Sequence, residues 1–198
     1  MKRIYKLAAL ALALAVTLAL LSGCEKENTA YLTIDGEAAD DAVYMYYLKS
    51  SMYRVMAMYG AQSSTEAFWT AELSGDETPF DTALALAAEK TAEEYIISRE
   101  FDRLSIPWDD EKEAKFEESL GAMTAGGRSY EKFLAASGLT DEAWRFITKN
   151  AVKRAALCDY YDALGKSFES ELSRLKASAD VSANGEAISR LDPVKIIK

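Results

Sequence analysis

Residues 40–59, DDAVYMYYLKSSMYRVMAMY, carry an apolar pattern that repeats every three or four positions. Such spacing places side chains on one face of an α-helix. Gly60 follows directly, where a helix commonly ends. The sequence therefore predicts a long amphipathic helix from Asp40 to Tyr59. Its inner face is expected to contain Met45, Leu48, Met52, Val55, Met56 and Tyr59.

Two further helices are predicted after this one. A weaker helical segment covers residues 66–73. A longer helix begins at Thr78-Pro79, because proline fits the first helical position and Asp81 places a negative charge near the positive end of the helix. We expect this helix to run to about Leu104, and Pro107 to close the connection behind it.

The next helix is predicted from its start and stop signals. Asp110 and Glu113 have the spacing of a capping box, with Asp in place of the usual Ser or Thr. Gly126-Gly127 is expected to end the helix, and a phosphate-binding loop is excluded there because no Lys-Ser/Thr follows. The inner face of the helix is expected to contain Phe116, Leu120 and Met123.

The last third of the chain is predicted to hold the longest helix. A short helix around Phe133 is closed by Gly138, and Thr140 caps the helix that follows. Apolar residues then keep near-heptad spacing over roughly 35 residues, about 50 Å of helix, with Gly165 as a weak point midway. This stripe consists of Trp144, Ile147, Ala151, Ala155, Cys158, Tyr161, Phe168, Leu172 and Leu175.

Two short strands are predicted near the ends of the mature chain. Residues 31–34 alternate in polarity and stop at Asp35-Gly36, and residues 179–182 form the second candidate. Because an isolated pair of strands is marginal in water, we expect the two to pair with each other against the helices. The predicted fold is therefore mostly all-α: one domain, residues 31–198, of long amphipathic helices with a two-stranded element from the chain ends.

The first 24 residues have the order of a secretory signal. Lys2, Arg3 and Lys6 precede an apolar run from Leu7 to Leu21. The alternative is an uncleaved anchor helix, although a run of about 15 residues is short for the roughly 20 that span a bilayer. The sequence favours a cleaved signal.

The residues behind the apolar run, Leu21-Ser22-Gly23-Cys24, resemble the lipobox of bacterial lipoproteins. The resemblance implies a signal peptide of residues 1–23, diacylglycerol on Cys24 and a lipidated tether of residues 24–30. It also implies a location on the outer face of the bacterial cytoplasmic membrane or on a periplasmic membrane surface.

The composition restricts the possible chemistry. The chain has no histidine, so histidine-dependent catalysis is excluded and the commonest metal ligand is missing. Cys24 and Cys158 are the two cysteines, and Cys158 lies on an apolar helical stripe, where a small buried hydrophobe is the expected role. No metal site and no cofactor are predicted.

Removing residues 1–23 leaves 20 basic and 32 acidic residues, a net charge of −12, which argues against nucleic-acid binding.

The helical region resembles a known family. Leu32-Thr33-Ile34-Asp35-Gly36-Glu37, Ile106-Pro107-Trp108-Asp109-Asp110-Glu111 and above all residues 130–145, YEKFLAASGLTDEAWR, are similar to the helical chaperone domain of the SurA, PrsA and trigger-factor group. The resemblance implies a bundle like the SurA/PrsA N-terminal domain. PrsA-like foldases also carry a parvulin domain of about 90 residues, for which this chain has neither the histidines nor the length. The resemblance therefore implies chaperone function without prolyl-isomerase activity.

The helix of residues 40–59 carries more rings and thioethers than one core stripe needs. Met and Tyr make adaptable contacts, which suits a surface that binds many unfolded sequences. The alternative for each residue is packing in the core. The candidate client-binding residues are Met45, Tyr46, Tyr47, Met52 and Tyr53.

The expected function is that of an ATP-independent, holdase-like chaperone or assembly factor for unfolded or partly folded exported polypeptides. The first alternative is an accessory subunit that binds one dedicated protein partner at the membrane surface. A third reading is an enzyme that uses carboxylates alone, such as Glu93-Glu94 or Glu117-Glu118, although such runs on amphipathic helices usually form solvated faces. The client and the oligomeric state stay open.

Cys24→Ser is expected to abolish lipid labelling and membrane retention, because stable attachment needs an anchor that an acidic domain does not replace. Metabolic labelling with a fatty-acid analogue, followed by membrane fractionation, measures both. Cys158→Ser is the matched control and should stay labelled. Full membrane retention of the Cys24→Ser chain would refute the anchor.

Overall fold

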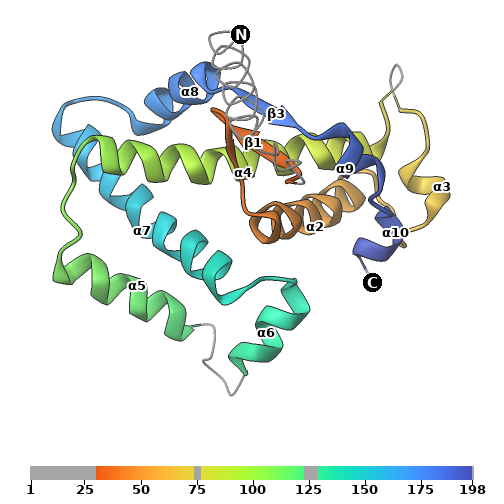
Figure 1. Ribbon diagram of the computed structural model, residues 1–198, viewed down its shortest axis with the longest axis horizontal. Helices are drawn as coiled ribbons and strands as arrows, with labels where there is room; N and C mark the ends of the chain where they lie inside the picture. The colour runs from red at the N-terminus through yellow and green to blue at the C-terminus, as the bar shows by residue number, and fades with distance from the viewer. Residues whose placement is uncertain (1–29, 74–76, 123–128, 198) are drawn as a thin grey trace, which may run out of the picture.

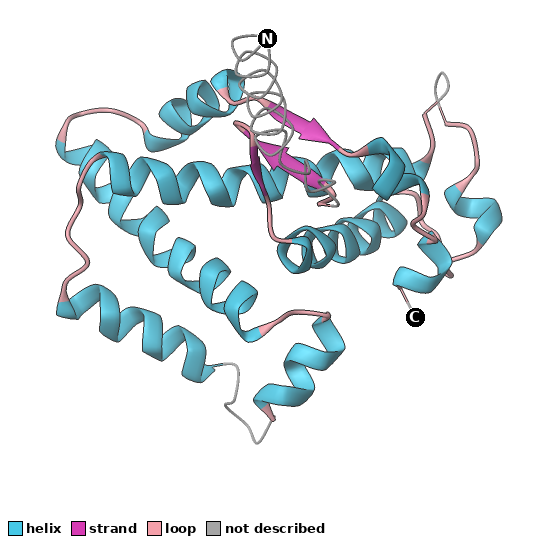
Figure 2. Ribbon diagram, in the orientation of Figure 1, coloured by secondary structure: helices cyan, strands magenta, loops and turns pink. Residues whose placement is uncertain are grey.

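The computed structural model describes residues 30–73, 77–122 and 129–197 (Figure 1). The predicted signal peptide of residues 1–23, Cys24 and Gly126-Gly127 therefore lie outside the described residues. The fold is mostly helical with a small antiparallel sheet of three strands, which Figure 2 shows near the middle of the longest described helix. The elements are β1 (Leu32–Ile34), β2 (Glu37–Ala38), α2 (Asp41–Met58), α3 (Glu66–Trp69), α4 (Pro79–Arg103), α5 (Asp110–Ala122), α6 (Tyr130–Ser137), α7 (Asp141–Ala163), α8 (Phe168–Ser178), β3 (Val181–Ala183), α9 (Gly185–Ser189) and α10 (Pro193–Ile196).

Helix α4 is the central element. It begins as predicted, with Pro79 in the first turn and a capping box between Thr78 and Asp81, and it spans 25 residues. It contacts α2, α3, α7, α8, β1 and β3. Ala83 and Ala87 are fully buried in the main core cluster. Among the described helices, none combines the length and apolar character needed to cross a bilayer.

The helix predicted over residues 40–59 is confirmed as α2. Asp40 caps it by accepting a hydrogen bond from the backbone N–H of Ala42 at 2.7 Å. The face toward α4 is buried and contains Tyr44, Leu48, Met52 and Val55. The 3.6-residue pattern therefore predicted the helix and three of its core residues, Leu48, Met52 and Val55. It missed Val43 and Tyr44, and Tyr59, which was predicted on the inner face, is 47% exposed.

The single long helix predicted after Thr140 is wrong. The chain forms two helices, α7 and α8, because Gly165 takes a left-handed conformation with φ of 67° and the backbone N–H of Lys166 turns back to the carbonyl of Tyr161. Ser167 then caps α8. The predicted stripe is also displaced: Ala151 and Ala155 are exposed. Since α7 packs against α4 on one side and α5 on the other, its buried residues include Thr148, Asn150, Val152, Lys153 and Leu157.

The predicted pairing of the chain ends is confirmed, but the sheet has three strands rather than two. β1 lies in the centre and pairs antiparallel with β3, with Leu32 opposite Ala183 and Ile34 opposite Val181. A tight turn at Asp35-Gly36, where both residues have positive φ, adds β2 on the other side. Two residues are too few for β2 to show as a sequence pattern.

The start of α5 differs from the prediction by one residue. Asp109, not Asp110, caps the helix by accepting a hydrogen bond from the N–H of Lys112 at 3.0 Å. Glu113 instead accepts a hydrogen bond from the Trp108 indole at 2.5 Å. The predicted inner residues Phe116 and Leu120 are buried, and Met123 lies outside the described residues.

The C-terminal tail packs on the core. After β3 the chain forms α9 and α10, and α10 contacts α3. The tail residues that pack against the main core cluster are Leu191, Val194, Ile196 and Ile197.

Deleting residues 181–198 is expected to lower the free energy of unfolding by several kcal/mol, because the deletion unpairs β1 and uncovers core residues. Each fully buried aliphatic side chain contributes about 1.5–3 kcal/mol to stability. A deletion of residues 185–198 keeps β3 and should cost less. Denaturant unfolding of both chains measures the difference. Unchanged unfolding curves would contradict any structural role of the tail.

Candidate functional site

Two of the predicted contact residues line one surface hollow. Tyr46 and Tyr53 lie seven residues apart on α2, two helical turns, and so share one face of the helix. With Lys49 and Ser50 of α2 and Ala136 and Ser137 of α6, they enclose about 250 Å³. We call this hollow the α2/α6 groove.

Local capping positions α6 against this face of α2. Ser129 caps the start of α6, and Gly138 ends it in the left-handed region with φ of 73°. The Lys49 ammonium donates a hydrogen bond to the carbonyl of Ala136 at 3.2 Å, which joins α2 to the end of α6. On the inner side of α6, the Phe133 ring packs edge-on against Trp144 at 4.9 Å.

Tyr46, which lines the groove, packs against Tyr47, which lies behind it and does not line the groove. The ring of Tyr46 packs edge-on against Tyr47, with centroids 5.2 Å apart. The Tyr47 hydroxyl donates to Glu94 Oε1 at 2.5 Å, so Tyr47 connects α2 to α4. Burial, with the nearby Glu94 carboxyl, raises the pKa of both tyrosines. Both phenols therefore stay neutral at neutral pH, and the Tyr47 hydroxyl is a hydrogen-bond donor.

The outer end of the groove is open. The Tyr53 side chain is 51% exposed, and its hydroxyl donates to the carbonyl of Ile197 at 3.4 Å. Met58 and Tyr59, at the end of the same helix, are 60% and 47% exposed. The C-terminal end of α2 therefore presents apolar surface next to the groove.

The other predicted contact residues do not line the groove. Met52 has 0% exposure and is a core residue, so its predicted role in binding a client is wrong. Met45 is half-buried and packs against the main core, and Tyr47 is engaged by Glu94. Helical periodicity could not separate these residues from Tyr46 and Tyr53, because every face of α2 carries rings or thioethers.

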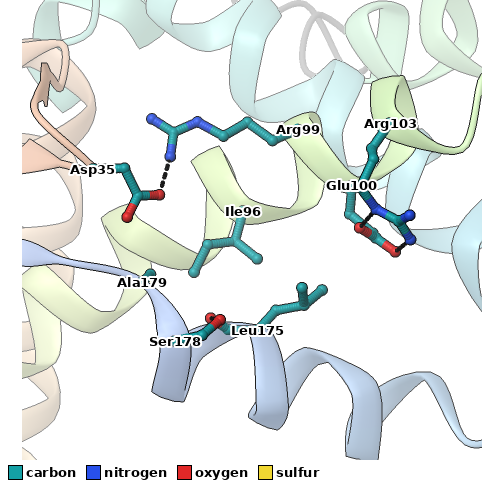
Figure 3. A pocket seen from close by; sticks show the side chains of 8 residues that line it. All are labelled: Asp35, Ile96, Arg99, Glu100, Arg103, Leu175, Ser178 and Ala179. Carbon is teal, nitrogen blue, oxygen red and sulfur yellow. Dashed lines mark hydrogen bonds and ion pairs between the residues drawn. The ribbon is translucent and has the colours of Figure 1, made fainter.

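A second hollow, of about 360 Å³, lies between α4, α8 and the turn after β1 (Figure 3). Its apolar wall consists of Ile96, Leu175 and Ala179. Arg99 forms ion pairs with Asp35 and, at 3.0 Å, with Glu37, and it donates to the carbonyl of Ile34 at 2.8 Å. This guanidinium therefore holds the β1–β2 turn against α4.

The other charged pair of this hollow is also internal. Arg103 donates two hydrogen bonds of 2.7 Å to the carboxylate of Glu100, and the hydroxyl of Tyr161 donates to the same group. The hydrogen bonds from Arg103 hold the pKa of Glu100 below its ordinary value. Because each arginine already faces a carboxylate, the hollow has no surplus positive charge with which to bind an anion.

The acidic pair Glu93-Glu94 is not the solvated face that the sequence suggested. Glu93 is 8% exposed and forms ion pairs with Lys90, Arg154 and Lys176. Burial raises the pKa of Glu94. Both carboxylates join α4 to its neighbours rather than facing a substrate.

The remaining chemistry is sparse. In the part of the chain that the structure describes, no group of three or more His, Cys, Asp or Glu residues is arranged to hold a metal ion. Cys158 is half-buried rather than fully buried, and burial raises the pKa of its thiol, which leaves it protonated and weakly reactive.

Comparisons of the chain with protein-family models, with curated proteins and with solved structures found no match. The resemblance of residues 130–145 to helical chaperones therefore stays a prediction.

Glu94→Gln is expected to raise the unfolding free energy at neutral pH and to flatten its dependence on pH above 4.5, the ordinary pKa of this carboxyl. The folded-state pKa lies above the unfolded one, so ionisation at neutral pH costs stability that returns as the pH falls toward 4.5. Glutamine is neutral and keeps an oxygen that can accept the Tyr47 bond. Denaturant unfolding at a series of pH values measures the effect.

Tyr47→Phe is the matched control. Loss of the hydroxyl removes a hydrogen bond that lowers the pKa of Glu94, so the pH dependence should become steeper, the opposite change. Equal slopes in the parent, Glu94→Gln and Tyr47→Phe chains would contradict the assignment.

Proposed function

We propose that this protein is a membrane-anchored extracytoplasmic lipoprotein that acts as an ATP-independent, holdase-like chaperone for exported polypeptides. Lipid on Cys24 holds it at the membrane surface, and the α2/α6 groove binds apolar segments of unfolded clients. We assign its helical region to the SurA/PrsA N-domain type of bundle. The support for this last point is the similarity of residues 130–145, which comprise α6, the connection and the first turn of α7.

The observation that carries the proposal is the joint position of Tyr46 and Tyr53 in one open groove. Their Cα atoms lie about 10.5 Å apart along α2, at 1.5 Å per residue. An extended client rises about 3.3 Å per residue, so a segment of three or four residues spans both rings. Tyrosine offers a rigid apolar ring and a polar tip, which suits contact with varied sequences.

Binding without covalent chemistry agrees with how the buried acids are used. Glu93 and Glu100 are ion-paired, and the Glu94 carboxylate accepts the hydroxyl of Tyr47. Each of these groups joins helices, so none is available to a substrate in this arrangement. The groove offers rings, a hydroxyl and the Lys49 ammonium, a set suited to reversible contact.

The alternative is an accessory subunit with one dedicated partner at the membrane surface. It is favoured by the C-terminal half of α2, where Tyr53, Met58 and Tyr59 are all exposed. Large apolar side chains that stay exposed together often mark a protein interface. A single saturable partner of nanomolar affinity would support this alternative, and a broad range of weaker clients would support the chaperone.

The combined variant Tyr46→Ser with Tyr53→Ser is expected to lose at least half of the protection that the parent gives a guanidine-denatured client protein diluted into buffer without nucleotide. The physical reason is the loss of both rings of the groove. Light scattering of the aggregating client measures protection. Tyr160→Ser with Leu164→Ser, two exposed side chains at the end of α7, is the matched control and should protect like the parent.

Melting curves separate binding from folding. Tyr46 is half-buried, so its loss also costs some stability, whereas the more exposed Tyr53→Ser alone should melt like the parent and still protect less. A prolyl-isomerase assay is expected to show no activity above background. A parent protein that never protects a client would favour the accessory subunit, and loss of protection in strict proportion to stability would place the binding surface elsewhere.

A further inference from the structure

Strand β3 forms an open edge of the sheet. The N–H of Asp35 donates to the carbonyl of Asp180 at 2.7 Å, and the N–H of Asn184 donates to the carbonyl of Tyr31 at 2.9 Å. In an antiparallel ladder, hydrogen-bonded pairs alternate with pairs that exchange no hydrogen bond. The backbones of residues 180, 182 and 184 therefore face β1.

It follows that Val181 and Ala183 direct their N–H and C=O groups away from β1, toward the outside of the sheet. Among the described residues, none forms a hydrogen bond with these four outward groups. A row of alternating donors and acceptors is the feature that an added strand recognises. The edge has neither proline nor lysine, two residues that commonly block such pairing.

The side chains of β3 show that the sheet is incompletely covered at this edge. Val181 lies opposite Ile34, and Ala183 lies opposite Leu32, so all four side chains share one face of the sheet. Leu32 and Ile34 are buried, whereas Val181 is 40% exposed. The apolar face of the sheet thus continues beyond the region that α4 covers.

We propose that the outer edge of β3 binds an extended segment of unfolded polypeptide as a fourth strand. The choice of polypeptide as the occupant rests on the proposed function, while the recognition by main-chain hydrogen bonds rests on the register of β3. Uncharged or basic segments are favoured, because Asp180 at the end of the edge forms no ion pair with a described residue and the chain is acidic, at −9. Apolar residues at alternate positions would cover Val181.

The edge is separate from the α2/α6 groove. Figure 1 places β3 and α6 on opposite sides of α2. A long unfolded chain can therefore contact both sites, and a weak contact at each strengthens the other through high local concentration. The groove would contact the side chains of the client, whereas the edge would form hydrogen bonds with its backbone.

The test uses the purified full-length protein and a fluorescent peptide of alternating valine and threonine with a lysine at each end. A second peptide has the same sequence with alternate backbone amides methylated, so that its side chains are kept and its strand pairing is blocked. Fluorescence anisotropy gives the dissociation constants. Val181→Pro removes one outward N–H without touching the hydrogen bonds to β1, and proline is tolerated at the first residue of a strand. Val181→Thr keeps the N–H and is the matched control.

We expect Val181→Pro to weaken binding of the first peptide at least tenfold and methylation of the peptide to do the same, while Val181→Thr binds like the parent. Equal binding of both peptides, unchanged binding by Val181→Pro, or no binding by the parent would overturn the inference. If Val181→Pro has a lower melting temperature than the parent, the test rests on the dissociation constants of the two peptides for the parent protein alone.

Two further outcomes are informative. Sedimentation could instead show that the parent forms a dimer which the peptide does not dissociate and which is absent in Val181→Pro. A second copy of the chain would then be the occupant of the edge, and the inference would be overturned. Failure of the groove proposal is measured separately, as absent protection from aggregation, so the two results are distinguishable.

Discussion

The fold depends on neutralising the acidic side chains that α4 buries. Glu93 and Glu100 are almost fully buried on a helix that contacts most of the other elements, and an unpaired buried carboxylate is strongly destabilising. Arg154 and Lys176 reach Glu93 from α7 and α8, and Tyr161 of α7 reaches Glu100. Each polar contact also fixes a neighbouring helix, so the arrangement around α4 is specified by charge pairing as well as by apolar packing.

The local features of the fold were predictable because neighbouring residues determine them. The course of α2, the start of α4 and the end of α6 at Gly138 follow from periodicity and capping. Features that depend on distant partners were missed. Asn150 and Lys153 are buried because Glu94 and Ser98 of α4 accept hydrogen bonds from them, and no pattern within α7 shows this.

The α2 side of the groove was predictable from the sequence, but the α6 side was not. Tyr46 and Tyr53 were both among the predicted contact residues, and their spacing of seven residues places them on one face of α2. The opposite wall comes from α6, more than 80 residues away, through a contact such as Lys49 to Ala136. Met52 and Tyr53 are neighbours in the sequence, yet one is in the core and the other is half exposed. They differ because Met52 lies on the side of α2 that faces the core around α4, and Tyr53 does not.

The position of β1 has a mechanical consequence. Residue 30 leads directly into the central strand, which is flanked by β2 and β3, and Arg99 clamps the far end of that strand through the carbonyl of Ile34. Tension applied to the N-terminal segment is therefore shared by two hydrogen-bonded ladders and transmitted to the longest described helix. An edge strand has ladder hydrogen bonds on one side only, whereas β1 has them on both sides, so freeing β1 requires breaking both ladders. A force on residue 30 would therefore act on both neighbours of β1 and on the Arg99 contact at its far end.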